Sequence, residues 1–110
     1  MKGAEDRSVE AALKYIATSA EDFARAKARV KYIEQFRKTL KARAYLEARG
    51  ETVSEREAKA YTEPEYVACL ESYKDAVYDH EILVAKRLRA ELVIEVWRTL
   101  NANKRAANIT

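Results

Sequence analysis

The stretch ARGETVSEREAKAYTEPE, residues 48–65, separates two much longer stretches of helix-forming sequence. It contains Gly50, one of only two glycines, and also the only proline of the chain. We expect Gly50 to end the preceding helix in the left-handed conformation that glycine adopts readily. Thr52 and Ser54 are each followed three residues later by a glutamate, which predicts a capped short helix through about Tyr61.

The final helix is expected to open at residues 62–65. Proline is tolerated in a first helical turn, and Thr62 with Glu65 fits a further capping box around Pro64. Nothing in the sequence stops this helix before Asn101. Apolar residues at spacings of three and four, or their multiples, predict its buried face. These residues are Tyr66, Leu70, Tyr73, Val77, Val84 and Leu88, continued by Ile94, Trp97 and Leu100.

The sequence before Gly50 predicts a short helix and then a long one. Residues 1–7 lack apolar periodicity and are expected to be loose. Ser8 can cap a short helix that ends near Thr18, and Ser19 can cap the next helix. The buried face of the long helix is predicted at residues spaced by three and four, with two aromatic residues widening it. The set is Phe23, Ala26, Val30, Ile33, Leu40 and Ala44, widened by Tyr32 and Phe36.

The fold class follows from length and composition. The 110 residues suffice for one small domain, and the scarcity of glycine and proline excludes most hairpin turns. We therefore expect a single all-α domain, built as an antiparallel hairpin of two long helices with one or two short ones. Placing Arg49 beside Glu65 sets Arg25 near residue 89, so the last helix overhangs by more than ten residues. Trp97 and Leu100 on that overhang predict a contact between subunits of a homo-oligomer.

Several functional classes find no support in the sequence. The one cysteine, Cys69, forms no internal disulfide and is expected to be a buried hydrophobic residue in a cytoplasmic protein. No segment is apolar enough to span a membrane. His80 is the only histidine and has no cysteine or histidine at ligand spacing, so we expect no metal site. Neither a glycine-rich phosphate loop nor a candidate triad is present, and we expect neither an enzyme nor a bound cofactor.

Charge is distributed unevenly, although the net charge is only +3. Residues 25–49 hold nine basic and two acidic residues, residues 51–81 hold nine acidic and three basic ones, and residues 86–105 are basic again. These charges can simply solvate and pair between neighbouring helices. The predicted register instead joins two basic segments into one pole that suits a polyanion. The pole is centred on Lys27, Arg29, Lys86, Arg87 and Arg89.

One stretch resembles a known family. The run LKARAYLEARG, residues 40–50, resembles the recombination mediator of T4-type phages, the UvsY family. The acidic connector and the long mixed-charge helix that follow also resemble that family. The resemblance implies a small, phage-encoded helical protein that forms ring-like oligomers and binds single-stranded DNA. It also implies partners, because such mediators help a RecA-like recombinase to displace a single-strand-binding protein.

The resemblance places DNA binding on Lys41 and Arg43, which match the basic residues of the family's motif. Independently, helical spacing brings Arg37, Lys38 and Tyr45 near Lys41. Basic groups with an interleaved aromatic ring suit single-stranded DNA, because cations follow the backbone and a ring can stack on an unpaired base. Tyr45 can equally be a half-buried packing residue. A second hypothesis is therefore a helical protein-interaction module, an adaptor or enzyme modulator that binds no nucleic acid.

Overall fold

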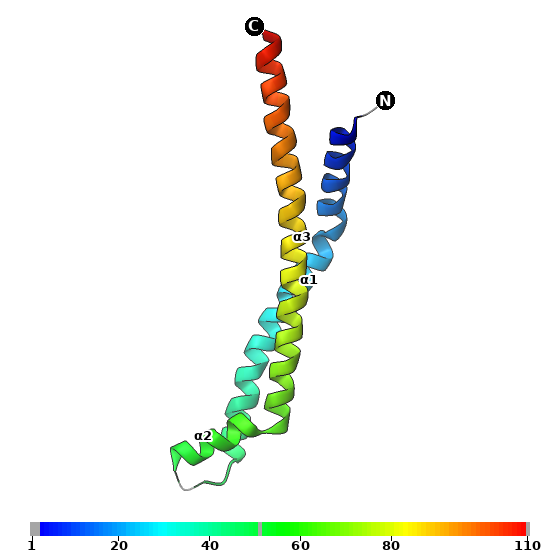
Figure 1. Cartoon of the computed structure of the whole chain (residues 1–110). Coiled ribbons are helices and arrows are strands. Elements are labelled where there is room, and N and C mark those ends of the chain that lie inside the picture. The colour runs from blue at the N-terminus through cyan, green and yellow to red at the C-terminus, as the bar shows by residue number, and fades with distance from the viewer. Residues whose placement is uncertain (1–2, 51, 110) are drawn as a thin grey trace. The chain divides into compact units, whose positions relative to one another are not determined.

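The computed structural model describes residues 3–50 and 52–109, which form three helices (Figure 1). Helix α1 is Ala4–Glu47, α2 is Val53–Thr62 and α3 is Pro64–Ile109. No strand occurs in these two ranges. The prediction of an all-α hairpin with two long helices and a short helix is confirmed.

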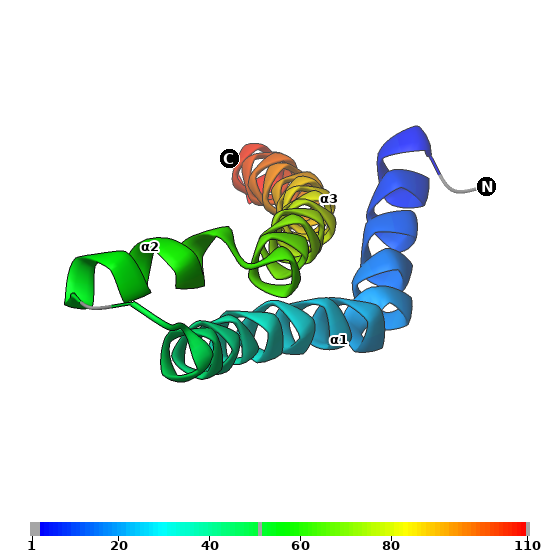
Figure 2. The same cartoon turned by 90° about the horizontal axis from the view of Figure 1, so that it is seen from below.

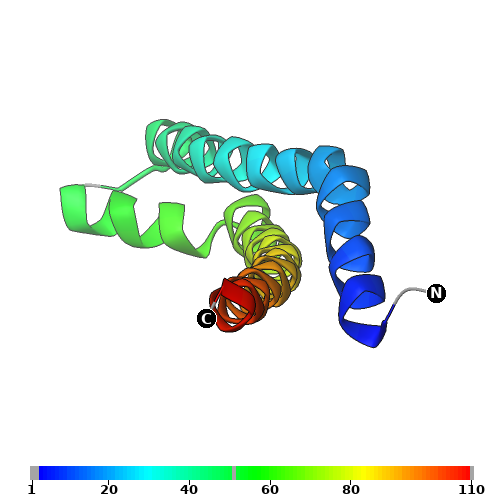
Figure 3. The same ribbon diagram turned by 90° about the horizontal axis from the view of Figure 1, so that it is seen from above.

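The chain divides into two compact units. The terminal unit consists of residues 3–24 and 81–109, and the tip unit is Arg25–His80. In the terminal unit, the first part of α1 runs opposite in direction to the last part of α3 and is inclined to it (Figure 3). In the tip unit, α2 lies transverse to the beginning of α3, as both side and bottom views show (Figures 1 and 2).

Helix α1 is continuous, so the predicted break near residue 19 is wrong. The Ser8 and Ser19 hydroxyls do not cap helices but donate to carbonyls one turn earlier, Ser8 to Ala4 at 3.0 Å and Ser19 to Tyr15 at 2.5 Å. A serine bonded in this way leaves the helical backbone pairing intact. Residues 4–7, expected to be loose, form the first turn of α1, and Met1 and Lys2 lie outside the described residues.

The predicted overhang of α3 is also wrong, because α1 has 44 residues and α3 has 46. The predicted register differs as well: it sets Arg29 near residue 85, whereas Arg29 pairs with Asp79 at 3.3 Å. Packing explains the difference, since Leu40 of α1 shares a core cluster with Tyr66 and Cys69 near the start of α3. Side-chain fit, and not the alignment of helix ends, sets which residues face one another.

Both long helices bury one face that repeats every seven residues, with alternating steps of three and four. Every residue of this face is buried or half-buried. Such a repeat keeps one narrow stripe of a helix facing its neighbour. In α1 the stripe is Val9, Ala12, Ile16, Ser19, Phe23, Ala26, Val30, Ile33, Arg37, Leu40 and Ala44. In α3 it is Tyr66, Cys69, Tyr73, Ala76, His80, Leu83, Arg87, Ala90, Ile94, Trp97 and Asn101.

The stripe of α1 contains every residue of its predicted face except the two that widened it. Tyr32 and Phe36 lie outside and are exposed, at 67% and 39%. In α3 the prediction is partly wrong, because Leu70 and Leu88 are exposed at 36% and 53%. Small residues replace them in the core, and Ala76 is only 1% exposed. Small side chains let a neighbouring helix approach closely, which large ones at those positions would prevent.

The connector follows the prediction at Thr52 and Pro64 but not at Gly50 or Thr62. Thr62, predicted to cap the final helix with Glu65, is the last residue of α2, and its hydroxyl donates to the carbonyl oxygens of Ala58 and Lys59 at 3.1 and 3.2 Å. Thr52 caps α2, and its hydroxyl accepts from the Glu55 amide at 3.1 Å. Pro64 begins α3 as predicted. Gly50, however, does not have positive φ, since no glycine among the described residues does. Its role is spatial, because a Cβ there would lie 3.1 Å from side-chain carbons of Glu55 and Arg56.

We predict that Ala76→Leu destabilises the protein by about 1–3 kcal/mol, because the added carbons would overpack the buried stripe of α3, where no space is left beside Ala76. The melting temperature followed by circular dichroism should fall by several degrees. The matched control is Ala68→Leu, because Ala68 lies on the same helix in the same unit but is exposed. Equal melting temperatures for the two variants would show that the face of α3 that contains Ala76 is not the packed face.

Candidate nucleic-acid interface

Lys41, the first residue indicated by the resemblance, already has a partner for its ammonium group within the protein. It is half-buried, and its ammonium group donates a hydrogen bond to the Tyr61 hydroxyl. The same group lies 4.1 Å from the centroid of the Tyr61 ring. The hydrogen bond to Tyr61 raises the pKa of Lys41 above its ordinary value, because it stabilises the charged ammonium group. Lys41 therefore joins α1 to α2 before any ligand binds.

Tyr45 and Arg37 are engaged in a similar way. The Arg56 guanidinium lies 4.6 Å from the Tyr45 ring centroid and donates to the Tyr45 carbonyl oxygen at 3.2 Å. Arg37 lies on the buried stripe, with its guanidinium 5.1 Å from the Tyr73 ring centroid. Tyr45 is half-buried, in agreement with its alternative interpretation as a packing residue. One face of its ring is covered by Arg56 and is not open to a base.

These cation–π contacts are frequent for a chain of this size. Energetically significant ones occur about once per 70–80 residues, whereas the described residues contain four. Three lie in the tip unit and link α1 to α2 or α3. The basic and aromatic pattern that suggested DNA binding thus has a structural role as well.

Other basic residues of the same stretch face solvent. Lys38 and Arg43 are exposed, as are Lys27 and Lys31, and none of the four forms an ion pair with any residue in the described ranges. Arg29 is exposed too, although its guanidinium contacts the Asp79 carboxylate. The unpaired cations of α1 are therefore available to an anionic ligand. Of the two residues indicated by the resemblance, Arg43 fits that role better than Lys41.

The members of the predicted basic pole are divided between the two units, with Lys27 and Arg29 in the tip unit and Lys86, Arg87 and Arg89 in the terminal unit. Arg29 lies opposite Asp79 within the tip unit. Arg87 belongs to the terminal unit, where it lies 5.0 Å from the Phe23 ring centroid and contacts Glu91 at 3.3 Å. Lys86 and Arg89 are exposed on the same helix and line a groove beside Ala12.

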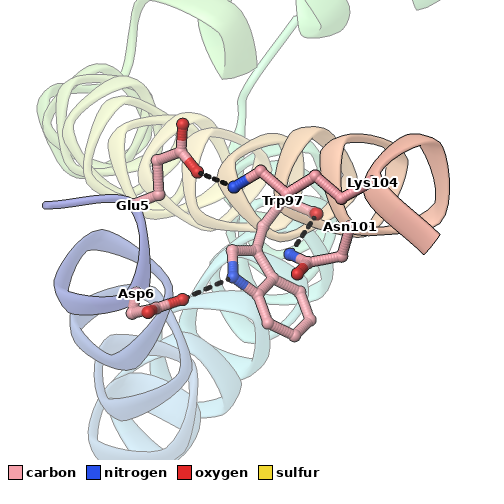
Figure 4. Close-up of polar contacts among 5 residues, drawn as sticks. All are labelled: Glu5, Asp6, Trp97, Asn101 and Lys104. Carbon is pink, nitrogen blue, oxygen red and sulfur yellow. Dashed lines mark hydrogen bonds and ion pairs between the residues drawn. The ribbon is translucent and has the colours of Figure 1, made fainter. Parts of the chain in front are cut away.

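Trp97, predicted as a subunit contact, is tied within the terminal unit (Figure 4). Its indole N–H donates to the Asp6 carboxylate at 3.0 Å, and Lys104 contacts Glu5 at 3.5 Å. Asn101 donates to the Trp97 carbonyl oxygen at 2.9 Å. Leu100 is 36% exposed and lines a groove with Trp97. The reason given for the subunit contact, an unmatched helix end, no longer applies.

Cys69 and His80 both lie on the buried stripe of α3. Cys69 is buried in the tip-unit core beside Leu40, as predicted. His80 lies half-buried on the stripe of α3. Within residues 3–50 and 52–109, no group of three histidine, cysteine, aspartate or glutamate side chains is placed to hold a metal ion. None of the helices searched over this part of the chain is long and apolar enough to cross a bilayer.

Tyr32 and Phe36 are the residues that sequence periodicity assigned wrongly. Their rings stack with centroids 5.9 Å apart and an interplanar angle of 8°, on the outside of α1. A second stripe with the same three-and-four spacing contains them and could have identified them. Its members are Arg25, Arg29, Tyr32, Phe36, Thr39, Arg43 and Leu46. Because three of its seven members are arginines, this second stripe is a poor candidate for a core.

Comparisons with known proteins do not assign the chain to a family. No family model matches it, and neither a curated protein nor a solved structure does.

We predict that Arg37→Ala lowers the free energy of unfolding by about 1 kcal/mol or more, because it removes the half-buried contact with Tyr73. The neighbouring Lys38→Ala removes an exposed charge that has no ion pair in the described structure, and should change it by less than about 0.5 kcal/mol. Urea titration followed by circular dichroism measures both. If Lys38→Ala were the more damaging change, the assignment of structural and solvent-facing cations would be reversed.

Proposed function

We propose that the protein binds single-stranded DNA and acts as a recombination mediator. The observation that carries the proposal is the row of solvent-facing cations on α1. Residues 25–45 hold eight basic residues and one acidic residue, Glu34. Several of those cations form no ion pair with a described residue, so their field is not cancelled locally.

The spacing of the cations supports a polymeric anion as the ligand. Lys27, Lys31 and Lys38 occupy one flank of α1, at steps of four and seven residues. These steps correspond to about 6 Å and 10 Å along a helix. A chain of phosphates can neutralise such a row one charge after another and release its condensed counterions. A single small anion could not meet all three.

The mediator role rests on the resemblance of residues 40–50 to the UvsY family. In this role the protein would bind DNA that is coated by a single-strand-binding protein and promote loading of a RecA-like recombinase. A rigid helical scaffold that displays cations on one flank suits a transient carrier of DNA, because surface cations bind strands without sequence preference. The role requires that the protein itself binds single-stranded DNA.

We predict that single-stranded DNA binds the wild-type protein with strong salt dependence. Changing Lys27, Lys31 and Lys38 together to alanine should weaken binding and flatten the log–log salt slope by about two units, since each lost phosphate contact removes about 0.7. Fluorescence anisotropy with a labelled oligonucleotide across a salt series measures both quantities. A labelled duplex gives the preference for single strands.

The matched control changes Lys14, Arg98 and Arg105 together to alanine. These exposed residues lie in the terminal unit, and the control removes the same three charges from the protein. Affinity and slope should change less in the control than in the test variant. Equal losses would mean that net charge alone attracts DNA. Absence of binding by the wild-type protein at low salt would exclude the proposed function.

The second candidate, a protein-interaction module, is favoured by α3. This helix carries apolar residues on the side opposite its buried stripe as well, and within the terminal unit Leu92 and Val96 are 56% and 58% exposed. A helix that is apolar on both sides is typical of one surrounded by other helices. This surface favours self-association or a partner protein, and it is compatible with an oligomeric mediator.

We predict that the protein self-associates through this surface, and that Leu92→Glu together with Val96→Glu reduces the assembly. A carboxylate buried in an apolar contact would be strongly unfavourable. Multi-angle light scattering should report a mass several times 12.6 kDa for the wild type and a smaller mass for the double variant. The control Glu91→Gln changes a neighbouring exposed residue without adding charge. A wild-type monomer at tens of micromolar would contradict the prediction.

A further inference from the structure

We infer that the stacked pair of Tyr32 and Phe36 is a platform on which an unpaired nucleobase stacks. The inference rests on the proposed function and deepens it, because it adds a base-contacting stripe on α1 to the row of Lys27, Lys31 and Lys38. The stripe and the row lie on different flanks of the helix, about 100° or more apart. Sequence and resemblance both pointed elsewhere, to Lys41 and Tyr45. The geometry points to the opposite flank of α1.

The two rings have the arrangement that stacking requires. They lie one helical turn apart on α1, nearly parallel, at 8°, and 5.9 Å between centroids. Tyr32 is 67% exposed and Phe36 is 39% exposed, so apolar ring surface faces water. Both are fixed on a helix and need little further ordering to receive a flat ligand. In contrast, Tyr45 and Tyr61 each have a cation over the ring.

Basic residues border the platform along the same stripe. Arg29 lies one turn before Tyr32, where its guanidinium also contacts the Asp79 carboxylate at 3.3 Å, and Arg43 lies two turns after Phe36 with no ion pair to a described residue. The distance from Arg29 to Arg43 along the helix is about 21 Å, enough for about six stacked nucleotides and fewer extended ones. A strand that follows α1 would therefore place phosphates near the arginines and bases over the rings.

An open groove of about 500 Å³ continues the platform toward α3 within the tip unit. Phe36 forms part of its wall, and Arg29 and Arg43 line it together with apolar Ile33 and Leu40. Glu65 also lines the groove, and its carboxylate disfavours a phosphate at that wall. The groove thus suits the uncharged base of a nucleotide, with the backbone held on the α1 side.

The ligand class follows from these features. Rings on a convex helix can stack only on bases that are not already paired, because a duplex hides the base faces. The site offers π surface and arginine, and no set of buried hydrogen-bond donors that would read one base edge. The polar side chains that line the groove, Arg29, Arg43, Glu65 and Ser72, are all exposed. The platform is therefore expected to accept single strands with little sequence preference.

The test compares Tyr32→Leu and Phe36→Leu, singly and together, with Tyr78→Leu. Leucine keeps the surface apolar but removes the ring. Tyr78 is the matched control, because it is a tyrosine of the same unit, 66% exposed, on a helix surface rich in acidic residues. Anisotropy with a labelled single strand should show at least a fivefold loss for each platform variant and little change for Tyr78→Leu. Circular dichroism checks that each variant is folded.

Salt dependence separates stacking from charge. The platform variants should lose affinity with an unchanged log–log salt slope, because no phosphate contact is removed. Arg43→Ala should flatten the slope. An oligonucleotide that carries 5-bromouracil should photocross-link to Tyr32 or Phe36, and mass spectrometry of the peptides locates the link.

The outcomes distinguish the two proposals. If the wild type binds single strands but the platform variants bind equally well and the cross-link maps elsewhere, the platform is wrong and the proposed function stands. If the wild type fails to bind single strands, the proposed function is wrong and the platform with it. A loss shared equally by Tyr78→Leu would also overturn the platform, because the effect would then belong to exposed aromatic surface in general.

Discussion

Small side chains along the buried stripes are the constraint on which the rest of the structure depends. Five of the eight buried side chains among the described residues are alanine or cysteine, among them Ala12, Ala76 and Ala90. They allow two helices to pack closely, but they remove little apolar surface from water. Two helices have no third layer, so larger aliphatic residues of α3 remain outside. Cation–π contacts at the flanks then add stability that this thin core does not supply.

The sequence predicts helices well here because helix signals are local. Pro64 and Thr52 act within a single turn, and both occupy the predicted positions at helix starts. Ser8 and Ser19 carry the same local signal, yet their hydroxyls bond back to carbonyl oxygens of the same helix and cap no helix start. The buried face of α3 is harder to predict from the sequence, because apolar residues lie on two sides of the helix. Only the packing partner decides between Leu70 and Cys69.

The candidate interface was only partly predictable for a related reason. Periodicity cannot tell an aromatic residue in a core from one on a surface, and Tyr32 has the same spacing as a buried residue. Nor can it show which cations are occupied, since Lys41 and Tyr61 meet only after α2 folds back toward α1. The density of basic residues in α1 was visible in the sequence. Which of these basic residues are structural and which face solvent depends on the contacts that form in the folded protein.

The uninterrupted seven-residue repeat has a consequence for how the chain can vary in length. One residue inserted within α1 rotates every following residue of the helix by about 100° about the helix axis. The buried stripe and the stripe that contains Tyr32 and Phe36 would then point to other sides of the helix beyond the insertion. Seven inserted residues would restore the facing. Insertions or deletions of fewer than seven residues are tolerable only outside the repeat, as around Gly50. At Gly50 itself, crowding by Arg56 also limits which residue can replace the glycine. Relatives of this protein should therefore differ in length by whole heptads within the long helices, and by single residues only at the tip and the ends.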